Sequence, residues 1–351
     1  MNKHQNIAIT GAAGFLGEHI IQELSTAHDE GLIHINRLVL IDIQACDIPR
    51  HTDTTITIET KIADVRDLDS LKNALTDIDL LIHSASVIDW GNLSKQFIYD
   101  VNVRGTENIL AACEANDVSK LIYTSTMDVL HGGDAITNGD ESLPYPKRYN
   151  DTYAETKALA EQLILKMNSP YLKTSVIRPC GIYGPKDPYH ITETINAIET
   201  GALKFRVGDG SANFQHVYVG NVAYSHALLA IAMLNGNDRV NGETYLITDD
   251  EAENFFDFLE PIVNDLGYDF PPRNRYIPYS FMYMIASCLE AVQFILKPIK
   301  AISLPVTRSS VKMLCKDLSF KTNKASEHFA YEPKFDKEQA FALTVDSFKK
   351  H

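Results

Sequence analysis

The chain has 351 residues, 45% of them hydrophobic and 22% charged, which is typical of a folded protein with one large domain and a smaller lobe rather than of a disordered chain. Its net charge of -14 provides no electrostatic attraction for nucleic acid or for an anionic membrane surface, so we expect no nucleic-acid partner. The five cysteines include no C-x-x-C pair, which favours a reducing cytoplasm over a disulfide framework.

Short apolar runs alternate with helical patterns through the first two thirds of the chain. The expected strands cover residues 6–10, 37–42, 56–62, 79–83, 120–124 and 174–178, and the helices between them include residues 16–24, 68–74 and 103–115. Because the first expected strand starts at residue 6, we expect no signal peptide before it. Buried strands that alternate with helices indicate a parallel sheet covered on both faces, so the expected fold class is α/β with a doubly wound parallel sheet.

A glycine-rich segment, TGAAGFLG at residues 10–17, directly follows the first strand and opens a helix. Gly11, Gly14 and Gly17 allow a tight turn, a close approach of backbone to a pyrophosphate and tight helix packing. The helix N-terminus adds N–H groups and the positive end of its dipole. A glycine turn occurs in many α/β proteins, but the strand–turn–helix context favours a Rossmann dinucleotide site. The other residues of the loop expected at the cofactor are Ala13, Phe15 and Leu16.

Asp42 ends the second strand, where a carboxylate accepts hydrogen bonds from the adenosine ribose hydroxyls and repels a 2′-phosphate. This position predicts NAD as the cofactor. The next cation along the chain, Arg50, would reach the ribose only on a loop that folds back. Asp64 and Val65 follow the third strand and are placed to meet the adenine, although Asp64 could equally cap the following helix.

Tyr153 and Lys157 form a Y-x-x-x-K pair, whose members lie on one face of a helix. The ammonium group can stabilise a neighbouring phenolate and so lower the pKa of tyrosine, normally about 10, for acid–base work. A surface Tyr–Lys pair is the alternative interpretation. The strand at residues 120–124 favours the catalytic one, because Ser125 or Thr126 at its end could hold a substrate oxygen beside Tyr153, although such hydroxyls also form turns.

Beyond about residue 179 the pattern loosens, and glycine and proline become frequent. We therefore expect a cofactor-binding domain at residues 1–180 and a substrate-binding lobe at residues 181–351. Residues 215–230 look like a strand and a helix that rejoin the main sheet, so the lobe is interleaved with the domain. No histidine stands at ligand spacing from a cysteine or carboxylate, and we expect no metal site.

The most apolar part of this lobe is residues 279–296, YSFMYMIASCLEAVQFIL. It could be a buried core helix, a lid over an apolar substrate, or a surface that docks on a membrane to take up lipid substrates. A spanning helix is disfavoured, because the run is short and contains Glu290. We expect a cytoplasmic homodimer with peripheral membrane contact through this segment.

These motifs together resemble those of the extended short-chain dehydrogenases/reductases over nearly the whole chain. The matching segments are TGAAGFLG, HSAS at 83–86, NVRGTENIL at 102–110, YTST at 123–126, YAETK at 153–157 and RPCGIYGPKDP at 178–188. Within that superfamily the chain is most similar to the 3β-hydroxysteroid dehydrogenase branch. GDESLPYP at 139–146 and VGDGSANFQHVYVGNVAYSHALLA at 207–230 point there, and especially to sterol-4α-carboxylate 3-dehydrogenases.

The resemblance implies a role for each matching residue. Tyr153 is the acid/base, and Lys157 lowers its pKa while holding the nicotinamide ribose. Thr126 takes the Ser/Thr position, with Ser125 as second choice. Further contacts with NAD or its surroundings are implied at Ser84, Ala85, Ser86, Asn102, Pro179, Gly181 and Ile182. Ser86 and Gly220 depart from the family pattern, but neither touches the expected chemistry.

The implied reaction is the oxidation of a secondary alcohol, such as the 3β-hydroxyl of a sterol-like or other apolar substrate, to a ketone. Two alternatives are a reductase of a β-keto acid or flavonoid-like ketone and an NAD-dependent sugar-nucleotide epimerase, against which the apolar lobe argues. Sugar dehydration is disfavoured, because Met127 and Asp128 stand where dehydratases have an Asp-Glu pair. A non-catalytic dinucleotide sensor typically lacks the tyrosine.

Overall fold

A seven-stranded parallel sheet forms the centre of the protein in the computed structural model, which describes residues 5–46, 55–88, 93–249, 251–296, 304 and 306–349. The strand order is β11-β7-β5-β4-β1-β2-β3. The strands are β1 Gln5–Thr10, β2 Ile35–Asp42, β3 Thr57–Ile62, β4 Leu80–His83, β5 Lys120–Thr124, β7 Lys173–Pro179 and β11 Thr244–Ile247. This order confirms the expected doubly wound α/β fold, and six of these strands lie where the sequence predicted them.

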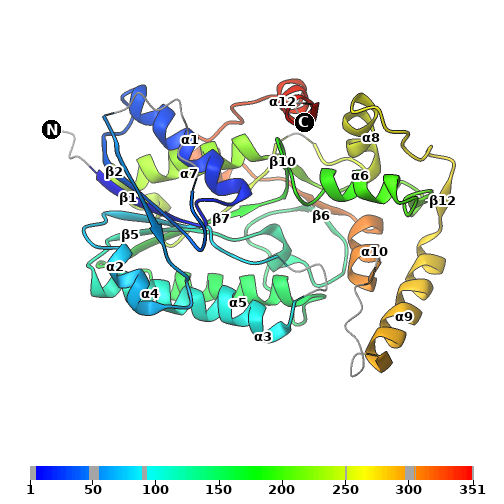
Figure 1. Ribbon diagram of the computed structural model, residues 1–351, viewed down its shortest axis with the longest axis horizontal. Coiled ribbons are helices and arrows are strands. Elements are labelled where there is room, and N and C mark those ends of the chain that lie inside the picture. The colour runs from blue at the N-terminus through cyan, green and yellow to red at the C-terminus, as the bar shows by residue number, and fades with distance from the viewer. Residues whose placement is uncertain are drawn as a thin grey trace.

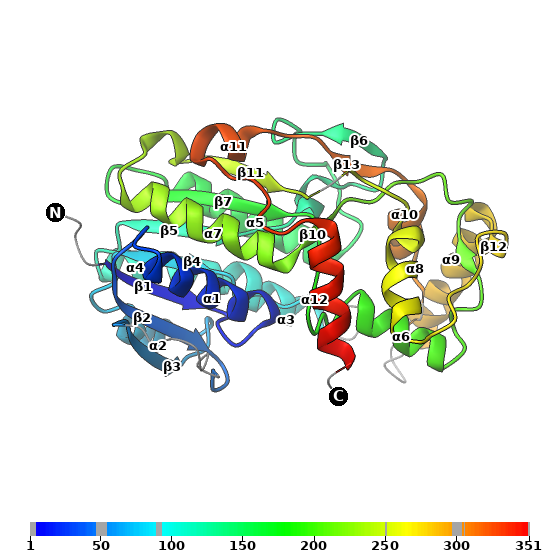
Figure 2. The ribbon, with the colours of Figure 1, turned by 90° about the horizontal axis from the view of Figure 1, so that it is seen from above.

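Helices cover both faces of the sheet (Figure 1). On one face α1 (Phe15–Asp29) packs against α7 (Val219–Leu234), as Figure 2 shows from above. On the other face lie α2 (Leu68–Ala74), α4 (Gly105–Ala115) and α5 (Thr152–Lys166). The central strand β1 is therefore buried on both sides, with Ile7, Ala8 and Ile9 fully inaccessible, which explains its unbroken apolar sequence.

The second lobe lies beside the carboxyl ends of the strands and is built from short pieces (Figure 1). Its helices are α6 Ile191–Glu199, α8 Phe255–Asp265, α9 Tyr279–Leu296 and α10 Arg308–Cys315, with α12 Lys337–Lys349 near the domain junction. Three two-stranded parallel sheets join β8 (Gly181–Tyr183) to β10 (His216–Tyr218), β9 (Arg206–Val207) to β12 (Tyr276–Ile277), and β6 (Ile136–Gly139) to β13 (Leu318–Phe320). The remaining short helices are α3 Lys95–Tyr99, η1 Asp100–Arg104, η2 Met127–Leu130, η3 Asp238–Val240 and α11 Lys324–Phe329.

The strand expected within residues 215–230 does not rejoin the main sheet. β10 pairs with β8 outside it, and β11 is the strand that returns to its edge beside β7. The helix of the same stretch, α7, does cover the sheet, because it is buried along most of its length against α1. The prediction was wrong for the strand, since an apolar run shows burial but not the partner strand.

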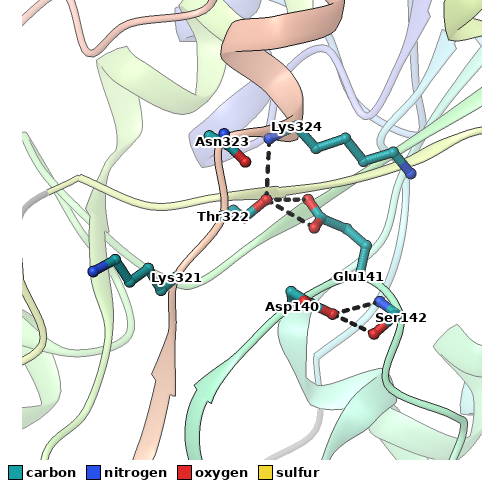
Figure 3. Close-up of a pocket in the computed structure, with 7 residues that line it drawn as sticks. All are labelled: Asp140, Glu141, Ser142, Lys321, Thr322, Asn323 and Lys324. Carbon is teal, nitrogen blue, oxygen red and sulfur yellow. Dashed lines mark hydrogen bonds between the residues drawn. The ribbon is translucent and has the colours of Figure 1, made fainter.

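Two segments far apart in the chain meet at the loop after β6, where they border a surface hollow of about 360 Å³ (Figure 3). The Glu141 carboxylate accepts hydrogen bonds from the Leu246 N–H and from the Thr322 hydroxyl, each at 2.9 Å. The Thr322 hydroxyl also accepts from the Lys324 N–H at 3.2 Å. Through Glu141 these bonds join the loop before α11 to the edge of the main sheet.

A buried ion pair lies between α5 and β7. The Glu161 and Arg178 side chains are 0% and 4% exposed, and the Arg178 Nη2 lies 2.5 Å from Glu161 Oε1. The Tyr145 hydroxyl donates to the same carboxylate oxygen at 2.5 Å. Because α5 carries Tyr153 and β7 ends at Pro179, this pair fixes the position of the helix that carries Tyr153 relative to the sheet.

Candidate active site

A cleft of about 1910 Å³ runs along the carboxyl ends of β1, β2, β3, β4, β5 and β7, between the sheet and the second lobe. This is where ligands bind in open α/β sheets. The sequence-predicted residues that line it are Gly11, Gly14, Phe15, Leu16, Gly17, Asp42, Asp64, Val65, Ser84, Ala85, Ser86, Ser125, Thr126, Tyr153, Lys157, Pro179, Gly181 and Ile182. The fold therefore brings segments that are distant in sequence into one site.

The glycine loop has no room for side chains at two of its positions. Gly11 has a φ of +72°, and a Cβ there would lie 2.8 Å from the Ala85 backbone nitrogen. A Cβ on Gly17 would overlap the Gly11 carbonyl oxygen, since α1 begins directly against the loop. Bare backbone and the N-terminus of α1 thus face the cleft, and this arrangement fits the pyrophosphate of a dinucleotide.

Asp42 stands at the end of β2 beside this loop. Its Oδ2 accepts a hydrogen bond from the Ala13 N–H at 3.0 Å, so Ala13 orients the carboxylate and does not itself line the cleft. The second oxygen, Oδ1, accepts from the Gln44 N–H at 3.3 Å. The carboxylate is held at the position expected for binding the adenosine ribose, and the residues of this end fit NAD.

Asp64 does not cap the helix that follows it. Asp67 performs that role for α2, accepting from the Asp69 and Ser70 N–H groups. Asp64 instead pairs with Arg66, whose Nη2 lies 2.5 Å from its Oδ2, and this hydrogen-bonded guanidinium lowers the pKa of the Asp64 carboxyl. Arg66 also lies over the Phe97 ring, 5.1 Å from its centroid. The sequence reasoning missed Arg66 at the adenine end of the cleft, although a cation two residues after Asp64 was a usable signal.

We expect a preference for NAD⁺ over NADP⁺ of at least about tenfold in kcat/KM, on the order of 1.4 kcal/mol. A 2′-phosphate would bring up to about two negative charges against Asp42 in a partly desolvated cleft. Arg66 is already paired with Asp64, and Arg50 lies outside the described residues.

Initial rates of purified Asp42→Ala with both cofactors test this preference. In Asp42→Ala the difference in kcat/KM between NAD⁺ and NADP⁺ should become smaller, mainly because NAD⁺ binds more weakly. Asp69→Ala, a change at an exposed carboxylate on α2, should leave this difference unchanged. Equal kcat/KM values in the wild type, or a higher value with NADP⁺, would show that Asp42 does not meet the ribose.

Tyr153 and Lys157 both face the interior from the first turns of α5, which Asp151 caps through the Ala154 N–H at 2.8 Å. The Lys157 Nζ donates to the Thr124 carbonyl oxygen at 2.5 Å and lies 4.2 Å from the centre of the Tyr123 ring. Lys157 is fully buried, and this burial lowers the pKa of its ammonium group to about 7.

Thr126 is the hydroxyl residue beside Tyr153. It follows β5 and lines the cleft with Tyr153, while its Oγ1 donates to Asp128 Oδ2 at 2.9 Å. Ser125 also lines the cleft, and its buried hydroxyl has no hydrogen-bond partner within the described ranges. The choice of Thr126 over Ser125 follows the family pattern and stays a prediction, since both residues line the cleft.

The electrostatics of Tyr153 differ from the expectation. Burial raises the pKa of its phenol well above the usual range, and the negative charge of Asp128 raises it further. The Lys157 ammonium group is directed at the Thr124 carbonyl and the Tyr123 ring. The expected effect of Lys157 on the pKa of Tyr153 stays a prediction. The group missed by the sequence reasoning is Asp128, which had been weighed only as half of a dehydratase pair.

Asn102 is bonded to the helix that carries Tyr153 and does not line the cleft. It lies in the π-helical turn η1, and its Oδ1 accepts from the Val87 N–H at 2.9 Å. Its Nδ2 donates to the Val87 carbonyl and to the Thr156 hydroxyl, each at 3.1 Å. The Thr156 hydroxyl in turn donates to the Tyr153 carbonyl oxygen at 3.0 Å. Asn102 thereby joins the loop after β4 to the helix turn that carries Tyr153.

Helix α9 spans Tyr279–Leu296, the range of the expected apolar segment, but it is not a core helix. Ala286 is its only buried residue, and among the described helices α9 alone has the length and hydropathy of a membrane span. One face lines the cleft, with Tyr283, Ser287 and Phe294 among its residues. Apolar side chains also remain exposed, including Phe281 at 52%. The buried-core interpretation is therefore wrong, because α9 packs mainly against the short helix α10.

The comparisons with known proteins agree with this geometry. A family model described as the 3-beta hydroxysteroid dehydrogenase/isomerase family matches residues 8–276. The chain belongs to this family. It is 36% identical to short-chain dehydrogenase/reductase family 42E member 1 of Danio rerio, over 95% of this chain and 86% of the relative. It is 31% identical to the decarboxylating sterol-4-alpha-carboxylate 3-dehydrogenase of Mus musculus, over 99% and 92% of the two chains.

A solved structure shares the fold at lower identity. The dTDP-glucose 4,6-dehydratase DesIV of Streptomyces venezuelae, determined with NAD bound, superposes with a TM-score of 0.74 at 19% identity, covering 99% of this chain and 97% of the other. The family and fold make the protein an NAD-dependent oxidoreductase of the extended short-chain dehydrogenase/reductase type.

Proposed function

We propose that the protein oxidises the secondary alcohol of an apolar, sterol-like substrate to a ketone, with Tyr153 as the acid/base. The observation that carries this proposal is that Tyr153 and Thr126 line the same cleft as the apolar helix α9. The names of the relatives support the substrate class, since both the mouse protein and an Arabidopsis thaliana relative 32% identical to this chain are named as steroid or sterol dehydrogenases that decarboxylate.

Each residue of the site would have its own role in the reaction. Tyr153 and Thr126 bind the alcohol oxygen, and Tyr153 removes its proton while NAD supplies the hydride acceptor. The cofactor would be held by the glycine loop, by Asp42 and by Lys157. If the substrate carries a carboxylate beta to the new ketone, loss of carbon dioxide can follow without a further catalytic group. We also propose that the chain divides near residue 180 into a cofactor-binding part and a substrate-binding part. The protein is further proposed to be a homodimer.

A substrate panel tests the function. The purified protein is incubated with NAD⁺ and, separately, with a 3β-hydroxysteroid, a sterol carrying a 4-carboxylate, a soluble β-hydroxy acid and a UDP-sugar, and NADH is followed at 340 nm. A ketosteroid product supports the proposal, and release of carbon dioxide from the acid identifies a decarboxylating enzyme. Turnover of only the β-hydroxy acid, or epimerisation of the UDP-sugar without net NADH, would replace it with one of the two alternatives.

We further propose that α9 is both a lid over the cleft and a membrane-docking surface on a cytoplasmic protein, through which a lipid substrate enters. Its cleft-facing side carries Tyr283 and Ser287, whereas Phe281, Met284 and Val292 expose apolar surface elsewhere on the same helix. An apolar helix surface of this kind fits the interface of a bilayer.

Charged substitutions at Phe281 and Met284 test this role. Because both side chains are more than half exposed, at 52% and 53%, Phe281→Asp/Met284→Asp should leave the melting temperature unchanged within about 2 °C. The KM for a sterol presented in vesicles should rise about tenfold, roughly 1.4 kcal/mol, while the KM for a soluble secondary alcohol stays constant.

Leu32→Asp is the matched control, since Leu32 is 50% exposed but follows α1, away from the cleft. An equal rise in KM for both substrates, or unfolding of the double variant, would contradict the docking role of α9.

A further inference from the structure

Two cations of the second lobe line the cleft within the described residues, Arg308 and Lys312, and both belong to α10. The charge of Arg308 is neutralised, because the Glu290 carboxylate accepts from its N–H at 2.7 Å and from its Nε at 2.6 Å. The Lys312 Nζ donates instead to an uncharged group, the amide oxygen Oδ1 of Asn150, at 3.1 Å. Lys312 is half-buried, and no carboxylate of the described residues forms an ion pair with it.

Lys312 lies beside the residues that lead into α5. Asn150, which accepts its hydrogen bond, stands three residues before Tyr153. The Ser309 hydroxyl, one turn earlier on α10, donates to Asp151 Oδ2 at 3.3 Å. The other oxygen of Asp151 caps α5. These contacts between α10 and the start of α5 place Lys312 at the end of the cleft where Tyr153 lies.

The loop after η2 packs against the hydrogen-bonded pair of Lys312 and Asn150. Gly133 in this loop has a φ of +97°, and a Cβ there would lie 2.6 Å from Asn150 Oδ1 and 2.8 Å from Lys312 Nζ. The absence of a side chain at Gly133 therefore makes room for the ammonium group. An ammonium group has three N–H donors, and the bond to Asn150 uses one of them, so Lys312 has donors left for a ligand in the cleft.

Negative charge surrounds this end of the cleft. Asp128, Asp151 and Glu290 all line it, and each already accepts hydrogen bonds from the protein. These carboxylates repel an anionic group of a ligand, so an anion binds here only beside a cation. Since Arg308 is paired with Glu290, Lys312 is the cation that fits this role among the described residues of the lobe.

We propose that Lys312 binds a carboxylate that the substrate carries on the carbon next to the alcohol carbon, and that the enzyme thereby selects such hydroxy acids over neutral alcohols. The inference rests on the proposed function, in which Tyr153 takes the proton of the alcohol. In such a substrate the two groups are neighbours, as Lys312 and Tyr153 are at the start of α5. The name of the mouse relative, a dehydrogenase of a sterol 4-carboxylate, agrees with this substrate class.

Lys312→Met removes the charge and keeps most of the length of the side chain. For a 3β-hydroxysterol with a 4-carboxylate, we expect KM to rise about 10- to 100-fold, the scale of a lost hydrogen bond to a charged group. The kcat should change less than about 3-fold, because the proton-transferring group is untouched. For the methyl ester of the same sterol, KM should stay within about 2-fold of the wild type. Lys312→Arg keeps the charge and should restore most of the affinity for the acid.

Lys120→Met is the matched control. Lys120 is also half-buried and bonded to an uncharged oxygen, Ser119 Oγ at 3.2 Å, but it lies at the other end of β5, outside the cleft. Its loss should leave KM for the acid within about 2-fold of the wild type. Melting temperatures of Lys312→Met and Lys120→Met show whether both variants are folded.

Calorimetry on the protein saturated with NADH tests the binding site without turnover. The wild type should bind the sterol acid at least about 10-fold more tightly than its methyl ester, and Lys312→Met should bind the two equally. Equal affinities in the wild type, or an equal loss for acid and ester in the variant, would overturn the carboxylate site. Binding of UDP that depends on Lys312, with no preference for the acid, would assign this cation to a nucleotide phosphate instead.

Failure of the proposed function has a different signature. A wild-type protein that oxidises neither the acid nor the ester removes the alcohol dehydrogenase activity, and calorimetry then still decides whether Lys312 binds the carboxylate. An enzyme that oxidises acid and ester with equal kcat/KM, in the wild type and in Lys312→Met alike, keeps its proposed function and loses the carboxylate site alone.

Discussion

Tyr153→Phe is expected to lower kcat for alcohol oxidation by about 10²-fold or more, the usual scale for loss of a general acid–base group. The substitution removes the one oxygen proposed to exchange a proton with the substrate, while the half-buried ring keeps its position in the cleft. The Thr126 hydroxyl keeps its bond to Asp128, so the local geometry has no reason to collapse. Steady-state kinetics with the substrate found in the panel measure the effect.

Two controls accompany this variant. Kd for NAD⁺ should change less than about 2-fold, because the phenol lies at the reacting end of the cleft and the glycine loop is untouched. Tyr171→Phe removes a hydroxyl from a side chain that is 88% exposed and should have wild-type kinetics. Turnover of Tyr153→Phe near that of Tyr171→Phe would refute the assignment of Tyr153 as the acid/base.

Glu161→Gln is expected to destabilise the protein by about 3–5 kcal/mol, the usual cost of removing one partner of a buried ion pair. The Arg178 guanidinium is 4% exposed and would keep its charge without a counter-charge, while the Tyr145 hydroxyl would lose its charged acceptor. Urea unfolding followed by circular dichroism measures the loss as a lower transition midpoint at constant slope.

An exposed pair provides the comparison. Glu59 and Lys61 lie 3.5 Å apart with 34% and 47% of their side chains exposed, so Glu59→Gln should cost no more than about 1 kcal/mol. The double variant Glu161→Met/Arg178→Met should recover much of the loss, because no unpaired charge then remains in the interior. Equal midpoints for Glu161→Gln and Glu59→Gln would mean that the buried pair is open to water.

Much of the fold and part of the site follow from patterns that are local in sequence. Apolar runs between helical stretches predicted five strands of the main sheet, since a strand buried on both faces has no polar alternation. The alternating Thr and Ile of residues 56–62 predicted the sixth, the exposed edge strand β3. The glycine loop of residues 10–17 and the Tyr153–Lys157 pair are each recognisable from a short stretch of sequence. Asp42 was recognisable because a carboxylate at that strand end has a specific partner in the cofactor.

Other features depend on which segments meet in space. Two of these features are contacts between elements distant in sequence: the pairing of β11 with β7 and the Glu161–Arg178 ion pair. The third is the exposed apolar face of α9, which no other element covers within the described residues. Periodicity records whether a residue is buried, but not which residue covers it.

The electrostatics of Tyr153 depend on such contacts most strongly. From the sequence alone, the spacing to Lys157 predicted a lowered pKa for the phenol. In the structure the ammonium group is bound to the Thr124 carbonyl, and burial together with Asp128 raises the pKa of Tyr153. The sequence by itself determined which residues could exchange a proton in this protein. Only the tertiary structure decided which of them lie near Tyr153. The strength of a charge interaction depends on distance and burial, and the spacing of residues in the sequence gives neither.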